Sequence, residues 1–133
     1  MVFSLLWCVI QGGSVQKRIL IVDDDAVPRH VLRRAFEASS GWEVMEAASG
    51  REAVEKARAF KPDLVVLDLW MPIVNGLEAA RVLRRMLPTV PIILLTPCDN
   101  KFPEHEAFSA GVTAVISKEA DVVNQVQDLL RAA

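Results

Sequence analysis

Short apolar segments rich in β-branched residues alternate five times with segments of helical periodicity along this chain. The first kind occupies residues 18–22, 42–47, 63–67, 91–95 and 113–117, and its composition is typical of strands. In the second kind apolar residues recur three and four positions apart, which predicts helices over residues 27–38, 50–60, 76–86, 103–110 and 121–132. A regular alternation of strand and helix predicts an α/β domain built on a parallel sheet.

The composition of three predicted strands indicates that the sheet is covered on both faces. Residues 19–22, 64–67 and 92–95 are uninterrupted apolar runs, as in parallel strands that are buried on both sides. Helix-start signals agree, because Ser49 with Glu52 and Asn75 with Glu78 form capping-box patterns, and Pro28 falls in a first turn. We therefore expect a doubly wound, five-stranded parallel sheet with five helices.

The size and charge of the chain exclude several classes of protein. At 133 residues it has the length of one domain, and its formal net charge of −2 lacks the basic excess that nucleic-acid binding needs. Cys8 and Cys98 are the only cysteines, in a domain large enough to need no covalent staple. We expect reduced thiols, a cytoplasmic location and no direct contact with nucleic acid.

The first ten residues, MVFSLLWCVI, include nine apolar ones. This run is too short to span a bilayer, it lacks the basic region of a signal peptide, and QGGSVQ ends it. We expect residues 1–16 to be a loosely ordered extension, with a membrane-surface or partner contact as the alternative. The domain itself is expected over residues 17–133.

Polar residues close four of the five predicted strands. Asp23, Asp24 and Asp25 follow the first, Asp68 the third, Thr96 the fourth and Lys118 the fifth. In an open parallel sheet these carboxyl ends share one edge, where ligands bind. Carboxylates gathered there would suit Mg²⁺, which would offset their mutual repulsion, and a carboxylate beside a metal, an ammonium and a hydroxyl can attack phosphorus. The pattern does not show which aspartate would be the nucleophile.

Four blocks of the sequence, in order, point to a known family. ILIVDDDAVPRHVLRRAF, PDLVVLDLWMPIVNGLEAARVLRR, VPIILLT and AGVTAVISK strongly resemble the receiver domain of two-component response regulators. The resemblance covers residues 17 to about 132 and implies a flavodoxin-like fold with strand order 2-1-3-4-5. It implies a phosphoacceptor that phosphorylates and dephosphorylates itself, rather than a dedicated enzyme.

The resemblance also assigns roles to individual residues. Asp68 matches the aspartate that takes a phosphoryl group from a phosphohistidine of a sensor kinase or phosphotransfer protein. Asp24 would bind Mg²⁺ directly and Asp23 largely through water, while Asp68 and the backbone carbonyl of Trp70 would complete the protein ligands. Asp25 matches a variable position.

Two further matches concern the switch. Thr96 corresponds to the hydroxyl that moves toward the phosphoryl group, and Lys118 to the lysine that pairs with a phosphoryl oxygen. The family's usual signalling face, here roughly residues 100–132, would carry a transient, phosphorylation-dependent homodimer or effector contact.

Several positions depart from the family pattern. Val115 stands where an aromatic ring commonly swings inward, and Glu119 follows Lys118 where proline is common. Pro97 removes an N–H next to Thr96 and favours extended dihedrals there. Trp70 would stand beside the phosphorylation site and hinder water, which predicts slow self-dephosphorylation.

Two alternatives remain. A module that keeps the fold but signals without phosphate would account for Val115, Pro97 and Glu119. ILIVDDDAV also fits haloacid-dehalogenase-like phosphatases, with Asp23 as nucleophile and Asp25 as general acid, although no later acidic pair follows Lys118 to complete the metal site of that family.

Overall fold

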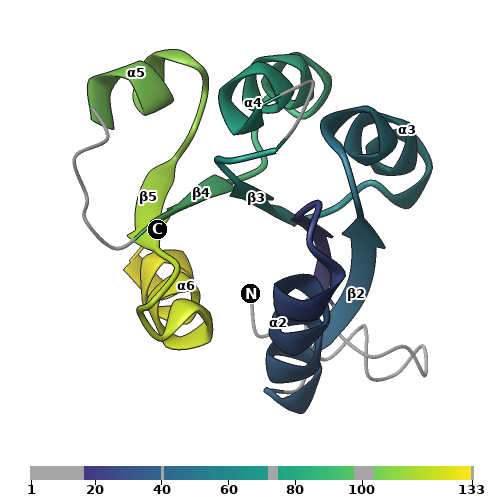
Figure 1. Ribbon diagram of the computed structural model, residues 1–133, viewed down its shortest axis with the longest axis vertical. Helices are drawn as coiled ribbons and strands as arrows, with labels where there is room; N and C mark the ends of the chain where they lie inside the picture. The colour runs from purple at the N-terminus through teal and green to yellow at the C-terminus, as the bar shows by residue number, and fades with distance from the viewer. Residues whose placement is uncertain (1–16, 40, 72–74, 98–103, 133) are drawn as a thin grey trace, which may run out of the picture.

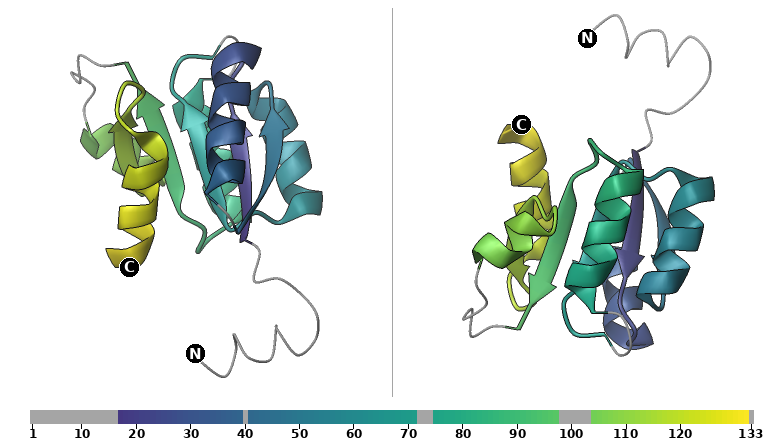
Figure 2. Two further views of the ribbon diagram at one scale, coloured as in Figure 1. Left: turned by 90° about the horizontal axis from the view of Figure 1, so that it is seen from below. Right: turned by 90° about the horizontal axis from the view of Figure 1, so that it is seen from above.

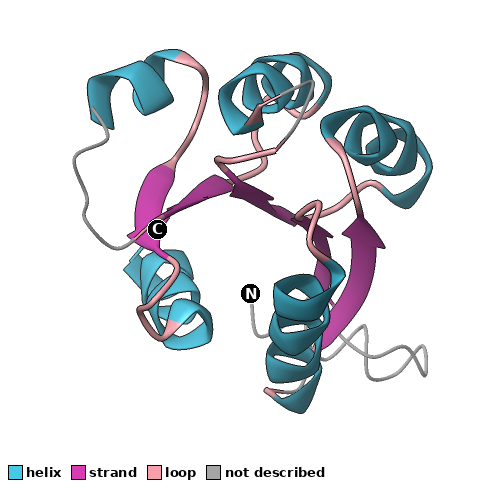
Figure 3. Cartoon of the chain, in the orientation of Figure 1, coloured by secondary structure: helices cyan, strands magenta, loops and turns pink. Residues whose placement is uncertain are grey.

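The computed structural model describes residues 17–39, 41–71, 75–97 and 104–132, which form one parallel sheet and the helices that cover it (Figures 1 and 3). The strands are β1 (Lys17–Val22), β2 (Trp42–Ala47), β3 (Leu64–Asp68), β4 (Ile92–Thr96) and β5 (Ala114–Ser117). The helices are α2 (Ala26–Ala38), α3 (Gly50–Phe60), α4 (Gly76–Met86), α5 (Glu104–Ser109) and α6 (Val122–Ala132). The strand order is β2-β1-β3-β4-β5 with every pair parallel, which confirms the predicted fold class.

The helices form two layers. Helices α2 and α6 cover one face of the sheet, and α3, α4 and α5 cover the other (Figures 1 and 2). Strands β3 and β4 are buried at every position, because they lie in the interior of the sheet and are covered from both sides. Under α2 and α6 the core contains Phe36, whose ring meets Trp42 edge to face with the centroids 5.7 Å apart. The helices contribute several small residues to the opposite core, among them Ala53, Ala57 and Ala80.

Side-chain caps start the helices where the sequence predicts them. The side-chain oxygens of Ser49 and Asn75 accept hydrogen bonds from the N–H groups of Glu52 and Glu78, at 3.1 and 3.0 Å. In the first of these motifs the glutamate carboxylate reaches back to the N–H of Ala48. These caps explain why the predicted first residues of α3 and α4 agree with the structure.

Other predicted bounds differ by one residue, for local reasons. Asp63 lies before β3, where its carboxylate accepts the N–H of Arg18 at 2.9 Å. Asp121 precedes α6 and accepts the N–H of Asn124, so it caps this helix instead of starting it. Strands β3 and β4 also end one residue later than predicted, on Asp68 and Thr96, so these two polar residues are part of the sheet.

Some of the sequence expectations concern residues outside the described part of the chain. Residues 1–16, including Cys8, and Cys98 belong to this group. Among the helices that are described, none combines the length and the apolar character that crossing a membrane requires.

Candidate functional site

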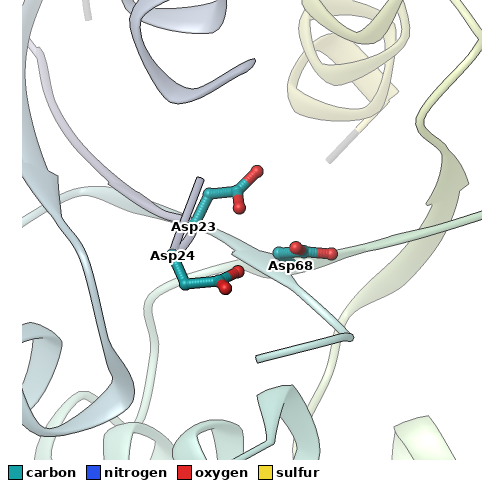
Figure 4. A group of neighbouring side chains, drawn as sticks. All are labelled: Asp23, Asp24 and Asp68. Atoms are coloured by element: carbon teal, nitrogen blue, oxygen red, sulfur yellow. The ribbon is translucent and has the colours of Figure 1, made fainter. Parts of the chain in front are cut away.

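Three carboxylates meet at the edge of the sheet where β1 and β3 end (Figure 4). Asp23 and Asp24 follow β1, and Asp68 is the last residue of β3. One oxygen of each lies within 4.8 Å of the others. The parallel pairing of β1 with β3 places these two strand ends side by side, which confirms that the aspartates converge.

The first carboxylate of the cluster is buried at a cost. Only 5% of Asp23 is exposed, and this burial raises the pKa of its carboxyl to about 6, with the negative charge of Asp68 adding to the effect. The N–H of Asp25, which donates to Asp23 Oδ1 at 3.0 Å, acts in the opposite direction. A buried acid held in this way favours a site that a cation completes.

Lys118 supplies the positive charge of the site. Its ammonium lies 2.9 Å from Asp68 Oδ1 and 3.7 Å from Asp23 Oδ2. Burial on its own would lower the pKa of Lys118, but the hydrogen bond and the charge of Asp68 outweigh it, so this pKa is raised. The peptide bonds of the described residues are all trans, the one before Glu119 included.

The third aspartate of the DDD run has a different role from the other two. Asp25 is exposed, lies outside the three-carboxylate cluster, and accepts the N–H of Val27 at 3.1 Å as the N-cap of α2. The run therefore combines two carboxylates of the site with one helix cap. This placement gives no support to Asp25 as the general acid of a phosphatase.

An ion pair that sequence reasoning missed anchors the cluster to its helix. Arg29 on α2 donates to the backbone carbonyl of Asp23 at 2.7 Å and to Glu46 on β2 at 2.7 Å. Burial alone would raise the pKa of Glu46, but hydrogen bonds from Arg33, Arg29 and His30 hold it below its ordinary value. Arg29 and Glu46 lie 17 positions apart, so no local pattern reveals the pair.

Thr96 carries a buried hydroxyl. It is 1% exposed, and its Oγ1 has no hydrogen-bond partner among the described residues. Buried hydroxyls normally have a partner, so an orphaned one at a strand end marks a place where a ligand oxygen could bind. The carbonyl of Thr96 accepts the N–H of Lys118 at 2.8 Å, which ties the two residues together.

A hollow of about 300 Å³ lies next to Thr96 and is lined by Val115, Glu104 and Gln125, among others. Val115 has a short aliphatic side chain, so this position of β5 contributes no ring to the space.

Trp70 and Gly76 shape the other side of the site. The N–H of Trp70 donates to Asp68 Oδ1 at 3.3 Å, while its side chain is 65% exposed. A Cβ at Gly76 would lie 2.5 Å from the backbone oxygen of Asp68 and 2.9 Å from the Cα of Leu69. Only glycine lets the start of α4 approach β3 this closely. The sequence analysis did not single out Gly76. The one available signal was a glycine at the start of a predicted helix.

The donor set fits a hard cation. The cluster combines oxygen atoms of two buried carboxylates and one exposed carboxylate, and Mg²⁺ binds through a few carboxylates while keeping water or phosphate oxygens as its other ligands. The ammonium of Lys118 partly balances the cluster but leaves it net negative.

Comparison with known proteins places this fold and site in a family. Residues 19–130 match the response regulator receiver domain. The chain is 40% identical over 103 residues to the chemotaxis protein CheY of Thermotoga maritima, covering 77% of this chain and 85% of that protein. It is 37% identical over 112 residues to the response regulator GacA of Pseudomonas viridiflava, covering 83% of this chain and 52% of that protein. The structure of CheY4 of Vibrio cholerae superposes with a TM-score of 0.79 at 28% identity, covering 89% of this chain and 99% of that one.

The chain belongs to the response regulator receiver domain family of two-component systems. Members of this family interact with histidine kinases or phosphotransfer proteins and are generally dependent on Mg²⁺. The chain spans about half the length of GacA.

Proposed function

We propose that this domain accepts a phosphoryl group on Asp68, in a Mg²⁺-dependent transfer from a phosphohistidine of a sensor kinase or phosphotransfer protein. The observation that carries the proposal is the position of Asp68, 3% exposed, next to two further carboxylates and 2.9 Å from the ammonium of Lys118. An aspartate that served only as a helix cap or turn residue would need neither the neighbouring carboxylates nor the ammonium.

The contacts of Asp68 suggest which oxygen reacts. Within the described residues, Lys118 and the N–H of Trp70 both approach Oδ1, so we assign Oδ2 as the nucleophile. This oxygen attacks phosphorus, the bond between phosphorus and the imidazole nitrogen breaks, and the imidazole leaves with the electron pair. Lys118 then pairs with a phosphoryl oxygen, where it stabilises the negative charge.

Asp23, Asp24, Asp68 and the backbone carbonyl of Trp70 are the groups we assign to Mg²⁺. When bound, the ion would neutralise the carboxylates and draw charge from the phosphoryl oxygens. The raised pKa of Asp23 supports this assignment, because a buried carboxyl that resists ionisation gains most from a cation.

Thr96 is the residue we assign to the switch. Its buried hydroxyl, which has no partner among the described residues, would donate to a phosphoryl oxygen, and the hollow beside Val115 would change shape as it moves. Because Val115 carries no ring, the change would reach the surface through the backbone of β5 and α5.

The face formed by α5, β5 and α6 is where we place a phosphorylation-dependent homodimer or effector contact. Phe108 and Leu129 are exposed there, and a shallow hollow of about 300 Å³ lies around Leu129. Comparing the mass in solution with and without beryllofluoride tests the dimer. Leu129→Asp should abolish a dimer that Val82→Asp, on α4, leaves intact.

Chemical labelling tests the whole proposal. The protein is incubated with Mg²⁺ and a small phosphodonor, and the phosphate is located by mass spectrometry in the parent and in Asp68→Asn and Asp23→Asn. Asp68→Asn should lose the label, Asp23→Asn should need far more Mg²⁺, and Asp128→Asn, an exposed control on α6, should behave as the parent. A label at any other residue contradicts the proposal.

The same experiment separates the alternatives. A phosphate-independent module would never be labelled, and the departures at Val115, Pro97 and Glu119 make it the second candidate. A phosphatase would turn over the donor and lose this activity on Asp23→Asn. The extent of the domain, residues 17–133, and a cytoplasmic location belong to the same proposal and rest on the sequence.

A further inference from the structure

An apolar groove of about 460 Å³ runs between α2 and α6, on the face of the sheet that these helices cover, and reaches Asp23 and Lys118. Val27 and Val31 form part of its wall on α2, and they are 71% and 63% exposed. Residues four apart on a helix lie one above the other, so the two valines form a continuous apolar strip. The volume lies within the range of about 300 to 1,000 Å³ of pockets that hold ligands.

The chain itself contains a strongly apolar segment among the residues that precede the described part of the structure. Nine of residues 1–10 are apolar, and none of residues 1–16 is charged. Such a segment gains free energy when apolar surface covers it. Having no charged side chain, it can also approach Asp23 and Lys118 without adding a side-chain charge to the site.

The connection between this segment and the domain is long enough to reach the groove. Residues 11–16, QGGSVQ, precede β1, and six residues extend to at most about 20 Å. Helix α2 runs back along β1, so the C-terminal part of α2 lies toward the start of β1 (Figure 2). This part of the helix contributes Ala35 to the groove. Strand β1 has six residues and spans about 20 Å. Ten residues in an extended conformation reach farther than that, so residues 1–10 are long enough to cover a groove that runs along α2 beside this strand.

We propose that residues 2–10 dock in the groove between α2 and α6 of the same chain. The short linker holds the segment at an effective concentration in the millimolar range, which favours it over a second copy of the chain at ordinary protein concentrations. Its large apolar side chains cover Val27 and Val31, which are otherwise exposed to water beside the site.

Thiol reactivity tests the docking in the full chain. With Cys98→Ser, Cys8 is the only thiol, and it lies inside the proposed docked segment. We expect Cys8 to react about tenfold more slowly with a thiol reagent than it does after Val31→Asp, which corresponds to about 1.4 kcal/mol of docking free energy. Val82→Asp is the matched control: Val82 is also exposed, but it lies on α4, which covers the other face. This control should leave the rate unchanged.

A disulfide trap provides the second readout. In the Cys98→Ser background, Val31→Cys should form a disulfide with Cys8 within one chain, at a rate independent of protein concentration, whereas Val82→Cys should do so far more slowly. Equal Cys8 reactivity in the parent and in Val31→Asp overturns the proposal. So do disulfides that link two chains, or capture of the segment by lipid vesicles while the groove stays open.

One consequence for the site rests on the function proposed above. A segment docked beside Asp23 would hinder a protein phosphodonor more than a small one, so Val31→Asp should accelerate labelling by the protein donor selectively. The thiol and disulfide measurements contain no phosphate. Failure of the docking and failure of the phosphoacceptor role are therefore distinguishable.

Discussion

Replacing Asp23 by asparagine should stabilise the metal-free fold while it weakens Mg²⁺ binding. Burial raises the pKa of Asp23 from an ordinary 3.8 to about 6, a difference of about two pH units. At about 1.4 kcal/mol per unit, ionising this buried carboxyl costs up to about 3 kcal/mol of folding free energy. Asparagine keeps the oxygen that accepts the N–H of Asp25 but cannot ionise, so it avoids this cost.

The pH dependence follows from the direction of the change. The unfolded chain loses the proton near pH 3.8 and the folded chain near pH 6, so the stability of the parent falls as pH rises through this interval. The advantage of the asparagine variant should be about 3 kcal/mol at about pH 7.5, about half of that at about pH 5, and only about 0.5 kcal/mol at about pH 4.

Urea unfolding in EDTA measures this difference, and a second series in Mg²⁺ tests its reversal. At Mg²⁺ tenfold above its dissociation constant, the parent should gain about 1.4 kcal/mol and the variant much less. Asp128→Asn removes an exposed carboxylate from α6 and should change the stability by no more than about 0.5 kcal/mol. Two results would contradict this cost of ionising Asp23. In one, Asp23→Asn is no more stable than the parent in EDTA near neutral pH; in the other, its advantage in stability does not shrink on acidification.

Three other changes test the surroundings of the site. Gly76→Ala forces a Cβ against the backbone of Asp68 and should cost about 1–3 kcal/mol in urea unfolding; an unchanged midpoint would contradict the close approach. Glu46→Gln removes the charge that Arg29 binds and should cost about 1–3 kcal/mol and weaken Mg²⁺ binding, as calorimetry can measure; unchanged affinity would show that Arg29 positions nothing. Trp70→Asn should speed the loss of phosphate from the labelled protein, if its ring shields the acyl phosphate from water; a rate equal to that of the parent counts against this role.

Much of the fold could be predicted because its signals are local. The caps at Ser49 and Asn75 act over three residues, and the apolar runs of β3 and β4 indicate their own burial. The predicted element types therefore agree with the structure, and every bound agrees to within one residue. Bounds differ by one residue where a side chain contacts a distant strand, as Asp63 does with Arg18.

The candidate site was predictable for a related reason. Every strand of a parallel sheet ends on the same edge, so polar residues that close the strands are predicted to lie close together. This rule is enough to select Asp23, Asp68, Thr96 and Lys118 as candidate site residues. Which of them reacts, and which residue binds a metal, came from the resemblance to a family.

By itself the sequence determined the order of strands and helices, the starts of the helices and the gathering of polar groups at one edge, because each depends on residues within a few positions or on the geometry of any parallel sheet. Only the tertiary structure decided that Asp25 caps a helix while Asp23 is buried, that Arg29 joins Glu46 to the site, and that a groove opens between α2 and α6. These features depend on how segments far apart in the chain pack against one another. Side-chain directions and burial are set by that packing, and no local pattern encodes them.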